Sequence, residues 1–118
     1  MDDKAYRKLE VWQLGMDIVD VIYKLTRQLP DDERYGLVSQ MRRAAISIPS
    51  NIAEGYGRHH RPEYIQHLYI SRGSLMELET QLIACVRQAM VDRESAVPTW
   101  TLMQKTGAKL TKLIQSLG

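Results

Sequence analysis

The chain has 118 residues, of which 44% are hydrophobic and 25% are charged, so it has the size and composition of one globular domain, residues 1–118, around one core. Its 16 lysines and arginines against 14 aspartates and glutamates leave a net charge of +2, which is too small to indicate nucleic-acid binding by itself. The single Cys85 excludes an intrachain disulfide framework, and the absence of a signal-like start and of a membrane-length apolar run predicts a cytoplasmic protein that contacts no membrane.

The first predicted helix covers about residues 8 to 28. Apolar side chains recur there at alternating three- and four-residue steps from Leu9 and Trp12 onward, which is the period of one helical face. Pro30 ends this helix, because the residue before a proline is pushed out of the helical region. The acidic residues that follow are suited to cap the next helix.

A second predicted helix begins near Leu37 and carries the same apolar period to Gly55 or Gly57, which resemble C-terminal stops. Pro49 lies inside this helix. A proline there removes one backbone donor and clashes with the carbonyl four residues back. We therefore expect a kink or a local break at Pro49.

The third predicted helix, residues 62 to 91, has the clearest pattern in the chain. Its apolar stripe keeps strict four- and three-residue steps, and Pro62 suits the first turn. Gly73 lies in the middle, where glycine costs about 1 kcal/mol relative to alanine, so we expect another helix to pack closely against its backbone. Gly15 and Gly107 either allow a similar close approach of another helix or lie at surface positions where glycine is tolerated.

Residues 92 to 98 are expected to form a turn, and a last helix is expected from Thr99 to Leu117. The sequence thus predicts four helices joined by three short connections. This pattern favours an all-α fold, an antiparallel up-down-up-down four-helix bundle.

The second predicted helix also carries a polar stripe beside its apolar one. One interpretation is a solvated face. The other is a partly buried polar network that faces the third helix of the same or another subunit, where matching charges are available. The stripe consists of Gln40, Arg43, Ser47, Asn51 and Glu54, and the candidate partners are Arg72, Glu77 and Glu79.

The segment between the second and third helices, residues 56–61, is the best candidate for contact with phosphate or nucleic acid. Arginine grips a phosphate with two hydrogen bonds, and tyrosine or histidine stacks on an unpaired base. A short basic loop is also commonly nothing more than soluble surface. The candidate residues are Arg58, His59, His60 and Arg61, joined by Lys105, Lys109 and Lys112 on the last helix.

Metal binding and catalysis have little support in the sequence. His59 and His60 are adjacent and lack the helical spacing of metal ligands, and His67 is far along the chain from completing a site. Cys85 lies on the apolar stripe of the third helix and is expected in the core. No nucleophile, base and orienting group share one face, so we expect no catalytic residue, no metal, no cofactor and no enzymatic activity.

Three stretches of the sequence closely resemble a known family. They read LVSQMRRAA (37–45), SIPSNIAEG (47–55) and GSLMELETQ (73–81). With them the chain resembles the bacterial four-helix-bundle proteins encoded in intervening sequences of 23S ribosomal RNA genes, also labelled S23 ribosomal proteins. The resemblance runs from Leu9 to about Met90. It implies a four-helix bundle and suggests a ring-like homopentamer. The related accessory proteins of diversity-generating retroelements bind nucleic acid and a reverse transcriptase through a basic surface.

Two functional hypotheses follow. In the first, the protein is a homo-oligomeric accessory protein that binds RNA or DNA, and oligomerisation multiplies a weak phosphate-binding site through avidity. In the second, it is an oligomeric scaffold that presents a groove to a protein partner and binds no nucleic acid. Steep salt dependence of RNA binding favours the first hypothesis.

Overall fold

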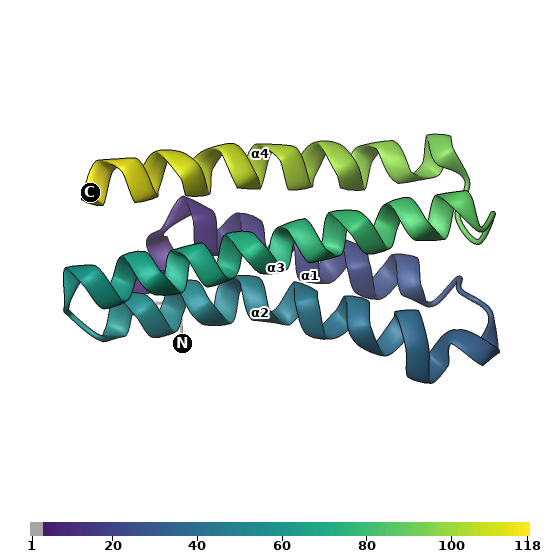
Figure 1. The fold of residues 1–118 in the computed structure, drawn as a ribbon, viewed down its shortest axis with the longest axis horizontal. Helices are drawn as coiled ribbons and strands as arrows, with labels where there is room; N and C mark the ends of the chain where they lie inside the picture. The colour runs from purple at the N-terminus through teal and green to yellow at the C-terminus, as the bar shows by residue number, and fades with distance from the viewer. Residues whose placement is uncertain (1–3) are drawn as a thin grey trace.

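Four long helices make up most of the chain that the computed structural model describes, residues 4–118, and no strand occurs among these residues (Figure 1). The all-α class predicted from the hydrophobic period is therefore confirmed. The helices are α1 (Glu10–Thr26), α2 (Ser39–Gly57), α3 (Arg61–Arg87) and α4 (Arg93–Leu117). Three short elements complete the chain, namely η1 (Ala5–Lys8) before α1, and η2 (Asp31–Glu33) and η3 (Arg34–Val38) between α1 and α2.

The helices lie side by side along the long axis of a molecule that measures 43 × 26 × 21 Å (Figure 1). α2 packs against α1 and α3, and α4 packs against α3 and α1. The α1–α2 and α3–α4 connections lie at one end of the molecule (Figure 1). The α2–α3 connection and the C-terminus lie at the other end, and η1 lies in the same half of the molecule, set in from that end (Figure 1).

The core between the helices is aliphatic, because the chain has no Phe and all its Tyr and Trp side chains stay at least partly accessible. Each fully buried aliphatic side chain contributes about 1.5 to 3 kcal/mol relative to an exposed one. The largest fully buried apolar residues are Ile18, Ile22, Met41, Ile48, Ile52, Leu68, Leu75, Leu78, Leu82, Met103 and Leu110.

Cys85 belongs to this core, as its place on the apolar stripe predicted. Its thiol donates to the sulfur of Met41 at 3.6 Å. Burial, and to a smaller extent the charge of Glu33, raises the pKa of the Cys85 thiol above its usual value. The side chain therefore stays a neutral thiol at physiological pH and acts as a small apolar group.

Pro49 does not interrupt α2, so the expected local break is wrong. The helix is continuous from Ser39 to Gly57 and buries the proline ring. α1 makes room for it, since a Cβ on Gly15 would lie 3.3 Å from both the Cβ and the backbone nitrogen of Pro49. Gly107 allows a similar approach of α4 to α3, with Leu75 at 3.3 Å from the position of a Cβ.

The close helix contact expected at Gly73 occurs at Gly55 instead. Gly73 is exposed, and none of the described residues comes within 4 Å of a Cβ placed there, so the expectation is wrong within one chain. Gly55 is not a stop but lies inside α2, where a Cβ would come within 2.5 Å of the Cβ of His67 on α3. α3 therefore lies directly against the α2 backbone at Gly55, before the chain reverses.

The end of α3 comes at Arg87, before the expected residue 91. Ala89 has a φ of 60°, in the left-handed region, and its N–H donates to the carbonyl of Val86 at 3.0 Å. The N–H of Met90 donates to the carbonyl of Cys85 at 2.9 Å. Both bonds use carbonyls of the last turn that a continuing helix would otherwise satisfy, so they terminate α3.

The expected turn over residues 92–98 is wrong, because α4 begins at Arg93. The Asp92 carboxylate accepts a hydrogen bond from the Ser95 N–H at 3.3 Å and so caps the new helix. Pro98 falls in the second turn of α4, where its ring is accepted without ending the helix. The capping signal at Asp92 therefore prevails over the breaking tendency of the proline.

Candidate nucleic-acid interface

Three residues join α2 to α3, and the four predicted basic residues of this turn are all exposed. Arg58 follows the last residue of α2, and His59 has a φ of 53°, which reverses the chain in the left-handed region. His60 is extended and precedes Arg61, the first residue of α3. Four consecutive basic residues are thus concentrated at one end of the molecule (Figure 1).

The two arginines of this turn differ in their partners. Arg58 lies 3.4 Å from the Glu54 carboxylate, one turn earlier on α2, and both side chains are about half exposed. An exposed pair of this kind contributes less than about 1 kcal/mol, so it breaks readily in favour of a phosphate. Arg61 has no acidic partner among the described residues. It therefore presents its full charge to solvent.

Aromatic rings lie beside these arginines. Tyr56 contacts Tyr64 edge to face, with ring centroids 5.8 Å apart and an interplanar angle of 88°, and it contacts His59 at 6.4 Å. Burial raises the pKa of the Tyr64 phenol, and the neighbouring Tyr56 raises it further. The phenol therefore remains a neutral hydrogen-bond donor at physiological pH.

The three lysines predicted on the last helix lie on α4 at different distances from the turn. Lys109 pairs with Glu10 of α1 at 3.3 Å, which ties the C-terminal half of α4 to the start of α1. Lys112 is exposed near the C-terminus, and the C-terminus lies at the same end as the α2–α3 connection (Figure 1). Lys105 is exposed in the middle of α4 and lies farther from this end.

Sequence reasoning missed the contribution of η1, which packs against α1 and α2 at this end. η1 carries Arg7 and Lys8, Lys4 precedes it, and its Tyr6 meets Trp12 of α1 edge to face at 5.6 Å. The guanidinium of Arg7 lies over the indole of Trp12 at 5.3 Å. The interleaving of basic and aromatic residues from Lys4 to Trp12 was the available signal. We call the following set the basic end: Lys4, Arg7, Lys8, Arg58, His59, His60, Arg61 and Lys112.

Part of the polar stripe of α2 contacts α3. The Asn51 amide group donates to the carbonyl and the hydroxyl of Ser47, both at 2.9 Å, and the Asn51 carbonyl accepts from His67 Nδ1 at 3.0 Å. The Ser47 hydroxyl is 2.9 Å from that of Ser74. Glu54 extends the chain of contacts, with a carboxylate oxygen 3.7 Å from His67. The α3 members of this cluster, His67 and Ser74, were not predicted.

The expected partners on α3 make other contacts, so their pairing with the α2 stripe is wrong within one chain. Gln40 and Arg43 are exposed and make no hydrogen bond or ion pair to residues 4–118. Their contact with α3 of a second copy of the chain remains a prediction. The observed contacts join Arg72 to Thr111 at 3.3 Å and to the Tyr69 ring, Glu77 to Gln81 at 3.1 Å, and Glu79 to Gln104 at 2.8 Å.

Within residues 4–118, no group of three or more His, Cys, Asp or Glu side chains is arranged to hold a metal ion. In the same range, no helix is both long enough and apolar enough to cross a bilayer.

Comparison with known proteins identifies a family and solved structures of similar fold. The model of a family described as 23S rRNA-intervening sequence protein matches residues 7–112, which is most of the chain. A solved structure from Bacteroides thetaiotaomicron VPI-5482, described as a protein of unknown function from the S23 ribosomal protein family, has a TM-score of 0.82 and 22% sequence identity. The similarity covers 89% of this chain and 95% of that one, and it concerns the fold. No curated protein sequence matches.

Proposed function

Because the chain belongs to the family of 23S rRNA-intervening sequence proteins, we propose that it is a non-enzymatic, homo-oligomeric accessory protein that binds RNA or DNA. In this proposal the four helices form an up-down-up-down antiparallel bundle, and the copies close into a ring. The basic end carries the nucleic-acid contacts. The concentration of arginines, lysines and aromatic rings at one end of a nearly neutral chain is the observation that supports this most directly.

The distribution of charge supports nucleic-acid binding although the net charge is small. At the basic end, the residues without an acidic partner in the described chain include Arg61 and Lys112, and the Glu54 partner of Arg58 is itself half exposed. The opposite end has mixed charge, with Asp31, Asp32, Glu33, Asp92 and Glu94 beside its arginines. Glu54 and Glu63 offset part of the charge at the basic end, but the basic residues there outnumber them, so a polyanion is attracted more strongly to this end than to the other.

Arginine and lysine contacts to phosphate supply affinity without reading sequence. The rings of Tyr56, Tyr64 and His59 next to them favour unpaired bases, because stacking on an aromatic ring requires a base outside a duplex. The expected ligand is therefore RNA or DNA with single-stranded segments, bound with little sequence preference.

The outer face of α3 supports self-association. Large apolar side chains flank Gly73 there, and a contiguous exposed apolar patch of this kind is typical of an interaction surface. The exposed positions of the patch are Tyr69, Ile70, Gly73, Met76 and Ile83, with exposed fractions of 44 to 55% for the four large ones. A ring would bury this face and repeat the basic end in every subunit, so that weak sites act together.

Sedimentation velocity of the pure protein, with and without ribosomal RNA, tests both parts of the proposal. We expect a closed oligomer, a pentamer, at micromolar concentration, and a faster-sedimenting complex when RNA is added. A monomer mass would contradict the assembly, and unchanged sedimentation with RNA at low salt would contradict nucleic-acid binding.

Gly73 provides a separate test of the assembly. In an isolated chain, Gly73→Ala fills open space and gains helix propensity of about 1 kcal/mol, so it stabilises the fold. If a second copy packs on this face, Gly73→Leu overfills the contact and lowers the oligomer mass, while Gly57→Leu, also in open space, does not. Equal masses for the two leucine variants would place the interface elsewhere.

A protein scaffold is the second candidate. A groove of about 430 Å³ between α3 and α4 supports it. The exposed side chains of Ile83, Val97 and Trp100 form an apolar surface there, and Arg87 and Arg93 also line the groove. An apolar peptide with acidic residues suits such a groove. Protein binding that is insensitive to RNA, in a chain that binds no RNA, would favour this function.

A further inference from the structure

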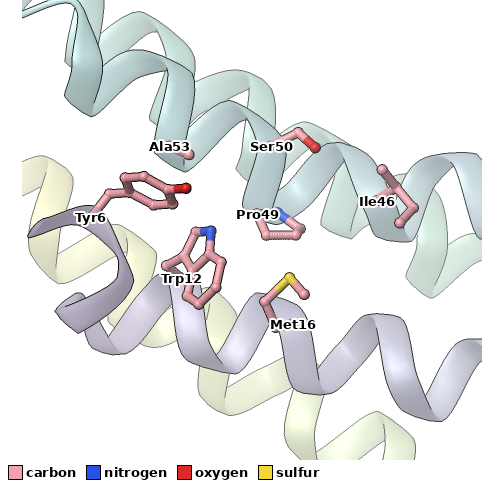
Figure 2. Close-up of a pocket in the computed structure, with 7 residues that line it drawn as sticks. All are labelled: Tyr6, Trp12, Met16, Ile46, Pro49, Ser50 and Ala53. Carbon is pink, nitrogen blue, oxygen red and sulfur yellow. The ribbon is translucent and has the colours of Figure 1, made fainter. Parts of the chain in front are cut away.

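A second groove, of about 240 Å³, lies between α1 and α2 where η1 passes over them (Figure 2). Tyr6 and Trp12 form one wall, and Pro49, Ser50 and Ala53 of α2 form the other. The groove is smaller than the pockets of about 300 to 1,000 Å³ that enclose drug-sized ligands. It accommodates one flat ring system rather than a larger molecule.

The polar atoms of the aromatic wall point into this space. Figure 2 shows the Tyr6 hydroxyl and the Trp12 indole nitrogen directed toward the gap between the two walls. Neither group makes a hydrogen bond to a residue between 4 and 118. An apolar partner would leave both donors unpaired, whereas a ring with acceptors at its edge can accept a hydrogen bond from one of them.

The two rings are held in position. They meet at an interplanar angle of 76°, so one presents a face where the other presents an edge, and Arg7 covers part of the indole. Pro49 is buried and fixed by its contact with Gly15. A planar ligand therefore meets a site that needs little rearrangement, which lowers the cost of binding.

Positive charge lies on the chain segment that carries Tyr6. Lys4 and Lys8 are exposed on η1 and just before it, the segment that carries Tyr6, and they belong to the basic end. A ligand that joins a flat heterocycle to a phosphate matches this combination of rings, donors and cations.

We propose that this groove binds one unpaired nucleobase of a single-stranded nucleic acid, while Lys4 and Lys8 contact the adjoining phosphates. The inference rests on the proposed function and adds to it a site that selects single strands. The base stacks against the face of one of the two rings, Tyr6 or Trp12, and accepts a hydrogen bond from the other ring, whose plane is nearly perpendicular. A base inside a duplex cannot enter, because both its faces are already stacked.

The chain has two tryptophans, so Trp100→Phe leaves Trp12 as the sole reporter. In this background, the emission of Trp12 is titrated with a short single-stranded RNA and with a duplex of the same length at low salt. We expect the single strand to quench Trp12 and the duplex to leave it nearly unchanged. This measurement leaves every groove residue in place.

Ala53→Leu, made in the same background, fills the groove, and Ala53→Ser keeps it open as the matched control. We expect the leucine variant to lose the quenching and to bind the single strand about 5- to 150-fold more weakly, the range for loss of one stacked base. Its affinity for duplex should stay within about twofold of that of the serine variant.

Each of the alternative outcomes contradicts either the proposed function or the groove inference. If the protein binds neither RNA at low salt, the proposed function fails. If it binds both equally, with Trp12 unquenched and Ala53→Leu equal to Ala53→Ser, the groove inference fails while the function stands. A fall in oligomer mass for Ala53→Leu would identify the groove as a contact between copies and would also contradict the inference.

Discussion

Gly55→Ala is expected to destabilise the protein by about 1 to 3 kcal/mol, although alanine brings a gain of about 1 kcal/mol in helix propensity. The new Cβ would come within 2.5 Å of the Cβ of His67, and within 3.3 Å of the Tyr64 ring. No rotamer change relieves a contact between two Cβ atoms, so α2 and α3 must move apart. Urea denaturation at fixed protein concentration measures the effect.

Gly57→Ala is the matched control, since it makes the same change two residues later where nothing lies within 4 Å. We expect this variant to be as stable as the parent or more stable. The separation of α2 and α3 in Gly55→Ala also disturbs the turn that carries the basic residues, so RNA affinity should fall with it. Equal stabilities of the two variants would contradict the close approach of α3 to Gly55.

Arg58→Ala combined with Arg61→Ala is expected to weaken RNA binding without lowering stability. Both side chains are exposed in the turn, so their removal disturbs little packing. Two phosphate contacts of up to about 1 kcal/mol each lower the affinity by up to roughly 30-fold for each subunit engaged. The slope of the logarithm of affinity against the logarithm of salt concentration should decrease by about 0.7 to 0.9 for each phosphate that is no longer bound.

Two further variants separate this site from a general effect of charge. Arg27→Ala with Arg34→Ala removes the same charge from exposed positions at the opposite end and should leave affinity nearly unchanged. Glu54→Gln removes the acidic partner of Arg58 and should raise affinity. If the two double variants weaken RNA binding equally, the binding is not located at the α2–α3 turn.

The helices were predictable because apolar side chains repeat along them with the helical period. The start of α4 was not, since Pro98 suggested a turn and the Asp92 cap outweighed it. The sequence also did not show which face of α3 packs against the core, because apolar residues lie on both of its sides and Met76 is more than half exposed. Without that orientation, the partners of the α2 stripe and the contact at Gly55 could not be assigned.

The candidate interface was predictable only where its residues are consecutive. Arg58 to Arg61 are adjacent in the chain, so one short segment revealed them. The η1 residues reach the same end through packing against α1 and α2, about fifty residues away in sequence, and no local pattern reports such a contact. The groove between Tyr6 and Ala53 depends on the same packing.

The affinity of the unmodified protein for a single-stranded RNA, measured from about 50 to 200 mM salt, tests the central claim most directly. Phosphate contacts at the basic end predict a straight log-log plot with a negative slope, and a steeper one if several subunits of a ring engage one strand. An affinity that does not change with salt, or no binding even at the lowest salt, would contradict the account and leave the protein scaffold as the better description.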